Sequence, residues 1–346
     1  MAPQTQKQWV ITGENGFDSL EKKEGVPLEK IGDKDVLVKI HAASLNYRDL
    51  VIPKGLYPFP KKDNVVPGSD GAGTVEAVGA NVTRFKKGDR VATLFNQAHL
   101  FGDLDPHSVA TGLGGAIDGV LRQYGVFDES GLVEVPKHLN WQEASTLSCA
   151  ALTAWNGLYG LQSRALKAGD TVLTQGTGGV SVFALQFAKA AGATVISTTS
   201  SDAKAKKLKE LGADHVLNYK TDPNWGETAK KLSPGGLGVT HVIEVGGPGT
   251  LRQSIKAVKY EGVISVIGFV AGGDQPPLLE VLSNICTVRG IFVGSRAQME
   301  DMNKAILANN IHPVVDPKVF SLDELKEAYQ YQWDQKHFGK LTIKID

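Results

Sequence analysis

Cysteine is nearly absent from this sequence, which has only Cys149 and Cys286 among 346 residues. Two cysteines exclude a disulfide-stapled scaffold and favour a reducing compartment, so we expect a cytoplasmic protein. An apolar run of about 20 residues is also missing, so no transmembrane helix is predicted. The net charge is zero, because 37 basic and 37 acidic side chains cancel. We therefore expect neither nucleic acid nor a membrane as a partner.

Glycine, in contrast, is plentiful, and its 39 residues cluster at the turns of two predicted domains. Residues 1–135 contain short strands broken by turns, which is typical of a β-rich module. Residues 136–294 alternate continuous apolar strands with helices, which predicts an α/β domain with a doubly wound parallel sheet. Residues 295–346 are too few to fold alone, and we expect them to return to the first module.

A glycine-rich turn between a predicted strand and a predicted helix indicates a dinucleotide site. The strand is Thr171–Gln175, and the helix begins near Val180. Glycines in this context let the backbone approach a pyrophosphate at the helix N-terminus. Ser181 takes the third motif position and is small enough to pack the helix against the strand. The predicted cofactor contacts are Gly176, Thr177, Gly178, Gly179 and Val180.

The end of the next predicted strand bears on the choice between NADH and NADPH. An acidic residue there would accept a hydrogen bond from the ribose 2′-hydroxyl and repel a 2′-phosphate. The sequence has Thr198-Thr199-Ser200-Ser201 instead, and Asp202 is expected to be the N-cap of the following helix. We expect NADPH, with its 2′-phosphate bound by Ser200, Ser201, Lys204 and Tyr219. The alternative for Lys204 is a solvated helix face shared with Lys206, Lys207 and Lys209.

Several motifs resemble those of the medium-chain dehydrogenase/reductase superfamily, and most closely its zinc-free quinone oxidoreductase branch. They are the glycine-rich turn and the segments 43–50, 55–58, 67–73 and 211–214. The resemblance covers nearly the whole chain, and relatives of this branch often carry the label zinc-type alcohol dehydrogenase-like. It implies a Rossmann domain, a GroES-like catalytic domain, and NADPH bound across the cleft between them.

The positions that hold catalytic zinc in other members of the superfamily are altered here. By resemblance, the three ligand positions fall on Asn46, Ser69 and Cys149, with Asp70 directly after Ser69. Zinc needs three nitrogen or sulfur donors plus water to act as a Lewis acid, and Asn and Ser are poor substitutes. The four cysteines of the family's structural zinc are also missing from residues 96–118. We therefore expect no metal.

The resemblance also implies a set of site residues. Asn46 and Thr153 are expected to lie beside the nicotinamide and, with Tyr57 at the edge of the substrate pocket, to form the catalytic set. Tyr57 can equally be a surface aromatic, and Arg48 and Asp49 are expected to form a structural ion pair. Relatives pair the strand around residues 290–294 with its twin, which implies a homodimer. The further cofactor contacts are Gly246, Gly268, Phe269, Phe292, Val293 and Lys340.

The altered zinc positions favour a conjugated acceptor as the substrate. Hydride transfer to a saturated ketone leaves a localised alkoxide, which benefits from a Lewis acid. Transfer to a quinone or an α,β-unsaturated carbonyl spreads the charge, so a few hydrogen-bond donors suffice. The hypothesis is an NADPH-dependent quinone or enone reductase that works without metal. Two alternatives stay open: an alcohol dehydrogenase and a non-catalytic NADPH-binding protein.

Overall fold

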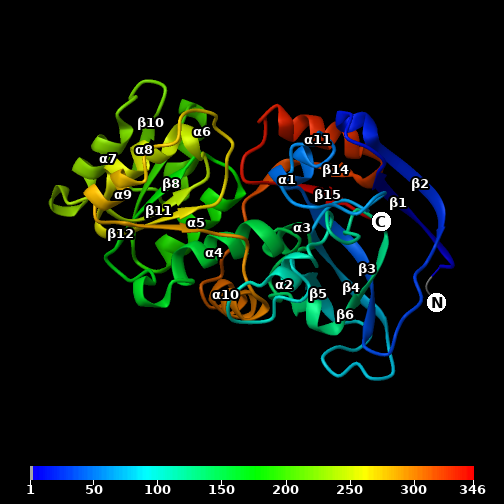
Figure 1. The fold of residues 1–346 in the computed structure, drawn as a ribbon. Helices are drawn as coiled ribbons and strands as arrows, with labels where there is room; N and C mark the ends of the chain where they lie inside the picture. The colour runs from blue at the N-terminus through cyan, green and yellow to red at the C-terminus, as the bar shows by residue number, and fades with distance from the viewer. Residues whose placement is uncertain (1–2) are drawn as a thin grey trace. The chain divides into compact units, whose positions relative to one another are not determined.

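The computed structural model describes residues 3–346, which form two compact units. The first unit contains the chain up to Leu152 together with Gly294–Asp346, and the second contains Thr153–Val293. Figure 1 shows the second unit in green to yellow, while the first unit carries both ends of the chain. The second unit is therefore continuous in sequence and the first is not.

The second unit is built on a six-stranded parallel sheet. The strand order is β10-β9-β8-β11-β12-β13, so the sheet grows outward in both directions from the pair β8 and β11. Every residue of β8 is buried, as expected for a strand covered on both faces. This confirms the predicted doubly wound sheet. The strands are β8 (Thr171–Gln175), β9 (Thr194–Thr199), β10 (His215–Asn218), β11 (Val239–Glu244), β12 (Val258–Val266) and β13 (Thr287–Gly290).

Helices connect these strands and cover the sheet. Helices α5 and α6 pack against β8, β9 and β10, while α7 and α8 pack against each other and α8 covers β11 and β12. Helix α7 was not predicted from the sequence; it buries Trp225 and Ala229 on one face. The helices are α4 (Leu152–Tyr159), α5 (Gly179–Ala190), α6 (Asp202–Glu210), α7 (Trp225–Leu232), α8 (Pro248–Ala257) and α9 (Leu279–Ser283).

The first unit is built on a mixed sheet of order β14-β15-β3-β4-β5-β7, with β6 also paired to β3. Strand β15 runs antiparallel to β3, with Thr342 opposite Ser44. The C-terminal segment thus returns to the first module, as predicted. The strands are β3 (Asp35–Ser44), β4 (Asp70–Val78), β5 (Arg90–Thr93), β6 (Tyr124–Asp128), β7 (Leu132–Glu134), β14 (Val315–Ser321) and β15 (Lys340–Lys344).

Shorter elements complete the first unit. Strands β1 and β2 form a separate antiparallel pair. Helix α11 contacts α1 and lies beside β14 and β15 (Figure 1). The elements are β1 (Thr5–Ile11), β2 (Leu20–Pro27), α1 (Tyr47–Val51), α2 (Pro106–Val109), α3 (Trp141–Ala144), a π-helix (Leu147–Ala151), α10 (Arg296–Ala308) and α11 (Leu325–Trp333).

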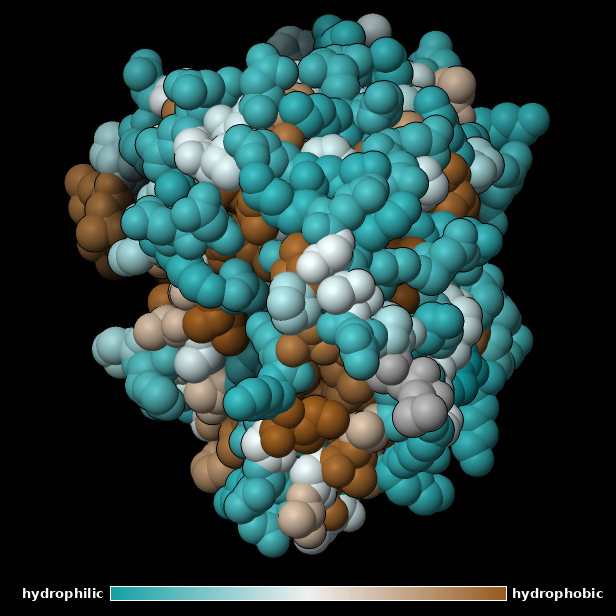
Figure 2. All heavy atoms as spheres, turned by 90° about the vertical axis from the view of Figure 1, so that its right-hand side faces the viewer, coloured by the Kyte–Doolittle hydropathy of each residue, from teal (hydrophilic) through white to brown (hydrophobic). Residues whose placement is uncertain are grey.

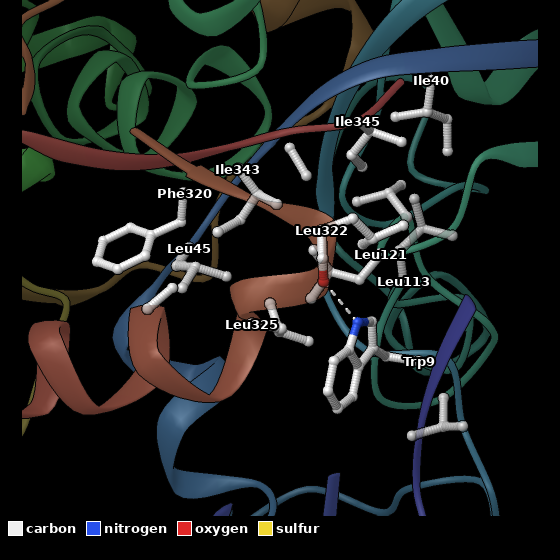
Figure 3. Packing of buried hydrophobic residues seen from close by; sticks show 14 of the residues in the cluster. Trp9, Ile40, Leu45, Leu113, Leu121, Phe320, Leu322, Leu325, Ile343 and Ile345 are labelled. Atoms are coloured by element: carbon white, nitrogen blue, oxygen red, sulfur yellow. Dashed lines mark hydrogen bonds between the residues drawn. The ribbon is translucent and has the colours of Figure 1, made fainter. Parts of the chain in front are cut away.

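The core of the first unit joins the two ends of the chain. Figure 3 shows Trp9 from β1 close to Leu322 and Leu325, and its indole N–H donates to the carbonyl oxygen of Leu322 at 2.7 Å. Ile343 from β15 belongs to the same buried cluster. Burying such side chains stabilises the fold by about 1.5–3 kcal/mol each. The C-terminal segment therefore contributes directly to the core of the first unit, through side chains that include Phe320, Leu322, Leu325 and Ile343.

The surface is polar where the β1 and β2 ribbon meets solvent. Figure 2 views the side that lies to the right in Figure 1, where hydrophilic side chains cover most of the face and apolar groups emerge between them. After Leu20, the side chains of β2 are mostly exposed. None of the helices within residues 3–346 is both long and apolar enough to cross a membrane.

The boundary between the units lies later in the chain than predicted. The sequence placed the end of the β-rich module at residue 135, but the first unit extends to Leu152. Helix α3 packs against β3 and β4, and the hydroxyl of Ser44 donates to the carbonyl oxygen of Ser145 at 3.0 Å. Residues 136–152 look from their sequence like the start of a helical region, but their partners are strands of the first unit. The return segment begins at Gly294, one residue before the predicted start.

Candidate functional site

The glycine-rich turn of the second unit has the geometry of a phosphate-binding loop. Gly176 has φ of 73°, a conformation that favours glycine, and a side chain on Gly176 or Gly178 would point into open space. Gly178 is the N-cap of α5, so the backbone N–H groups of the first helical turn face outward. The hydroxyl of Ser181 donates to the carbonyl oxygen of Gln175 at 2.5 Å, which ties the helix to the strand as the motif predicts.

A buried hydrogen-bond network joins the ends of the two central strands, β8 and β11, from which the strand order runs outward on both sides. Glu244 at the end of β11 is fully buried, and Gln175 at the end of β8 donates to it at 2.7 Å. The other carboxylate oxygen of Glu244 accepts from the backbone N–H groups of Gly246 and Gly247, each at 2.9 Å, and from Thr250 at 2.5 Å. Ser254 also donates to this carboxylate. The network fixes the loop after β11, where ligands of doubly wound sheets bind.

The residues predicted to bind a 2′-phosphate follow β9 and β10. Ser200 and Ser201 come directly after β9, and Lys204 lies in the first turn of α6, half-buried, whereas Lys206 is exposed. Tyr219 follows β10, and its N–H donates to the carbonyl oxygen of Thr199 at 3.1 Å. No acidic side chain ends β9.

The expected N-cap of α6 is corrected by the structure. Ser201 is the N-cap, because its side chain accepts from the backbone N–H of Lys204 at 3.4 Å, and Asp202 is the first helical residue. The carboxylate of Asp202 accepts from Asn218 at 3.4 Å instead. A serine cap uses an oxygen lone pair, so the hydroxyl proton of Ser201 can still be donated to an anion.

The other predicted cofactor residues of the second unit also follow strand ends. Gly246 follows β11, Gly268 and Phe269 follow β12, and Phe292 and Val293 follow β13. Because the sheet is parallel, these ends share one edge. Along this edge, a cavity of about 280 Å³ is lined by residues that include Glu244, Gly247 and Phe269.

Val293 has a strained backbone conformation, and the side chain of Asn156 is hydrogen-bonded to it. Its φ of 56° is unusual for a β-branched residue. The amide of Asn156 donates to the carbonyl oxygen of Val293 at 2.7 Å. Asn156 lies on α4, one helical turn after the buried Thr153. The structure thus connects the helix of Thr153 to the segment that contains Val293, and strained backbone of this kind often marks a functional site.

Asn46 and Lys340 come together in the first unit, although they are 294 positions apart in the sequence. Asn46 begins α1, and its backbone N–H donates to the carboxylate of Asp49 at 2.8 Å. Burial raises the pKa of Asp49 to about 6, against the opposing effect of Arg48. The Lys340 ammonium, only 3% exposed, donates to Asn46 Oδ1 at 2.5 Å and to the carbonyl oxygen of Leu45 at 2.7 Å.

A second row of polar groups lies beside Asn46. The hydroxyl of Ser69 donates to Asp70 Oδ1 at 2.6 Å, and Asn46 Nδ2 donates to Ser69 Oγ at 3.5 Å. Asp70 Oδ2 lies 3.4 Å from the Lys340 ammonium. Burial, and to a smaller extent the charge of Asp70, raises the pKa of the Cys149 thiol to about 12. Cys149 is therefore a neutral thiol at physiological pH.

Arg48 and Tyr57 form a third part of this site. Arg48 is half-buried, and its Nε donates to the hydroxyl oxygen of Tyr57 at 3.3 Å. The guanidinium carbon lies 5.1 Å from the centre of the Tyr57 ring and 4.7 Å from that of Phe95. Arg48 Nη1 also lies 3.5 Å from Asp49, which confirms the predicted ion pair. Tyr57 is thus anchored to α1 and is not an isolated surface aromatic.

The sequence did not reveal the contacts of Lys340 or the role of Glu244. Lys340 was expected to contact the cofactor; that contact stays a prediction, and the structure shows its ammonium held among Leu45, Asn46 and Asp70. Glu244 was not singled out, although an acid inside an apolar strand just before two glycines is a usable signal. Among residues 3–346, no group of three or more His, Cys, Asp or Glu side chains is arranged to hold a metal ion.

Comparison with known proteins gives consistent matches in both units. Residues 32–137 match the model of the alcohol dehydrogenase GroES-like domain, and residues 179–308 match the model of the zinc-binding dehydrogenase. The zinc-type alcohol dehydrogenase-like protein of Schizosaccharomyces pombe is 51% identical, and the match covers 98% of this chain and 99% of that protein.

Two further matches extend the comparison. The 2-methylene-furan-3-one reductase of Solanum lycopersicum is 30% identical over 99% of this chain and 79% of its own length. The crystal structure of a candidate alcohol dehydrogenase from Sinorhizobium meliloti 1021 superposes with a TM-score of 0.90 at 40% identity, and covers 99% of this chain and 100% of that one.

Proposed function

The chain belongs to the medium-chain dehydrogenase/reductase family of oxidoreductases, and from that premise we propose that it reduces quinones or α,β-unsaturated carbonyls with NADPH and without a metal. The observation that carries this proposal is the cluster of Asn46, Ser69, Asp70, Cys149 and Lys340 in the first unit. It supplies a fixed hydrogen-bond donor, the amide of Asn46, and a buried cation of its own.

The donor set of this cluster does not suit zinc. A zinc ligand must be an available lone pair on nitrogen, sulfur or a carboxylate, and cysteine must first lose its proton. The amide oxygen of Asn46 and a carboxylate oxygen of Asp70 already face the Lys340 ammonium. Burial raises the pKa of the Cys149 thiol, so zinc binding there would have to displace a proton. A second cation at this place would repel the first, so we assign no step to zinc.

The groups around Asn46 and Arg48 suit a substrate whose negative charge is delocalised. When bound, NADPH supplies a hydride. A conjugated acceptor then carries charge on its oxygen, which hydrogen-bond donors can stabilise. Arg48 Nε donates to the oxygen of Tyr57, so the hydroxyl proton of Tyr57 points elsewhere and can be donated to that oxygen. The relative from Solanum lycopersicum is a 2-methylene-furan-3-one reductase, and a 2-methylene-furan-3-one is such a conjugated carbonyl.

The choice of NADPH rests on the groups after β9 and β10. The dinucleotide would be held by the backbone of residues 176–180 and by the loop that Glu244 fixes. At the far end, Ser200, Ser201, Lys204 and Tyr219 offer hydroxyl and ammonium donors, and no carboxylate ends β9. Donors of this kind suit a 2′-phosphate, and a ribose 2′-hydroxyl usually pairs with an acid. This supports NADPH over NADH.

The decisive experiment measures NADPH oxidation with a panel of quinones, enones, aldehydes and alcohols, with and without a chelator. We expect turnover of quinones or enones that a chelator leaves unchanged. Tyr57→Phe, which keeps the ring and removes the hydroxyl, should lower kcat by about 10²-fold, the usual contribution of a proton donor. Stoichiometric zinc with chelator-sensitive alcohol oxidation would establish the alcohol dehydrogenase alternative. Tight NADPH binding without any turnover would establish the non-catalytic one.

We also propose a homodimer in the cytoplasm. Strand β13 is at the end of the six-stranded sheet, and Val288 on it is exposed. Apolar side chains beside it are exposed as well, with Leu282 at 70% and Ile285 at 51%. An exposed apolar edge strand can pair with a second copy of itself. The cytoplasm is supported by the two cysteines, both free.

A further inference from the structure

A lysine is buried at the centre of the proposed substrate site. The side chain of Lys340, at the start of β15, is only 3% exposed. Its ammonium donates to Leu45 O at 2.7 Å, to Asn46 Oδ1 at 2.5 Å and to Asp70 Oδ2 at 3.4 Å. Three acceptors match its three N–H bonds. Burying a cation is unfavourable unless it is paired, so these three contacts must offset the free energy lost by removing the ammonium from water.

The ammonium determines which way the Asn46 amide points. An ammonium has no acceptor, so only the amide oxygen of Asn46 can face it. The amide nitrogen must then face the opposite side, where Ser69 Oγ lies at 3.5 Å. Ser69 gives its own proton to Asp70 at 2.6 Å, so its lone pairs are left to accept from Asn46. The four side chains form a closed ring in which each donor has one possible direction.

One N–H of Asn46 remains available after this ring is closed. Its amide nitrogen carries two N–H bonds, and among residues 3–346 only Ser69 accepts one of them. Asn46 is half-buried, so a small molecule can reach it. A donor held in one orientation is worth more to a developing anion than one that must first turn.

We propose that Lys340 is a positioning residue that holds the Asn46 amide with its second N–H directed at the oxygen of the substrate. This role rests on the proposed reduction of a quinone or enone. Lys340 does not touch the substrate, since its three N–H bonds are used. It replaces rotational freedom of the amide with a single orientation, and it balances the buried charge of Asp70.

The test separates orientation of Asn46 from charge balance alone. Lys340→Met combined with Asp70→Asn removes both charges and keeps the volumes similar. If Lys340 only balances Asp70, this double variant keeps wild-type turnover. If it orients Asn46, kcat falls by about ten- to a hundredfold while KM changes little, because the amide can then turn its oxygen to the substrate. Lys344→Met, on the same strand and exposed, is the matched control and should match the wild type.

A second variant tests the proposal if the double variant Lys340→Met/Asp70→Asn, here called the charge-free pair, folds poorly. Asn46→Asp retains an oxygen for Lys340 and removes the N–H donor, so it should lower kcat to the same extent. Asn46→Leu, which removes the same N–H donor without adding a charge, should cause no further loss in the charge-free pair, because both changes remove the same hydrogen bond. Further loss on combination would overturn the proposal.

The experiments distinguish a failure of the proposed reductase function from a failure of the role proposed for Lys340. If the wild type reduces no member of the panel, the proposed function fails and this role of Lys340 falls with it. If the wild type turns over and the charge-free pair equals it, only the role of Lys340 is refuted. A reduced kcat in the charge-free pair and in Asn46→Asp, with no further loss when Asn46→Leu is added to the pair, supports both.

Discussion

Cys149 should be an unreactive thiol, and this can be tested without any substrate. Its pKa is raised from 9.0 to about 12 by burial and by the charge of Asp70. Since the thiolate is the reactive form, and a thiol with this pKa holds about a thousandfold less thiolate at pH 8 than one with a pKa of 9, Cys149 should react far more slowly than an ordinary thiol. The test protein is Cys286→Ser, in which Cys149 is the single thiol.

The assay is the rate of reaction with a chromogenic disulfide between pH 7 and pH 10.5. Slow reaction alone does not distinguish a raised pKa from a blocked path, so the pH dependence decides. With a pKa near 12, the rate should rise about tenfold per pH unit through pH 10 without a plateau. Unfolding in urea should release one thiol that reacts at the ordinary rate.

The effect of Asp70 and the shape of the pH profile both test the raised pKa of Cys149. Asp70→Asn in the same background should speed the reaction, because it removes a negative charge that opposes the thiolate. A plateau near pH 9 in the folded protein would refute the raised pKa and would reopen Cys149 as a metal ligand. The reverse variant, Cys149→Ser, reports on Cys286 alone, which is half-buried with a pKa that burial also raises.

Three further predictions follow from the second unit. Lys204→Ala should weaken NADPH binding by about ten- to a hundredfold through the loss of a charged hydrogen bond and spare NADH, whereas Lys206→Ala should change neither. An equal loss for both cofactors would contradict the 2′-phosphate assignment. Glu244→Gln should lower the free energy of unfolding in urea by about 2–4 kcal/mol, because an amide nitrogen would face N–H or O–H donors; a loss below about 1 kcal/mol would argue against the network. Leu282→Asp should convert a dimer to a monomer in sedimentation equilibrium, and an unchanged mass would argue against this interface.

The fold of the second unit was largely readable from the sequence. The predicted strand Thr171–Gln175 matches β8 residue for residue, and all five of its side chains are buried, the polar Thr174 and Gln175 included. The motif serine also has its predicted packing role. Helix α7 was missed because its sequence is polar on most sides. Asp202 was mistaken for the N-cap because serine and aspartate are both good caps, and only the backbone geometry selects Ser201.

The candidate site of the first unit was less predictable, since its contacts span the chain. The sequence, through resemblance, identified Asn46, Tyr57 and Lys340 separately. It did not reveal that Lys340 pairs with Asn46 and Asp70, because that contact depends on β15 lying against β3. It also placed the domain boundary at residue 135, because a helical pattern does not say which sheet a helix covers.

The return of the last strand to β3 has a consequence for how the protein is made. The second unit is one uninterrupted stretch and can fold while the rest is still being synthesised. The first cannot be finished until the ribosome has released residues 340–344. A chain that stopped before residue 340 would therefore keep all the residues of the parallel sheet, but it would lack both the strand that pairs with β3 and the ammonium that faces Asn46.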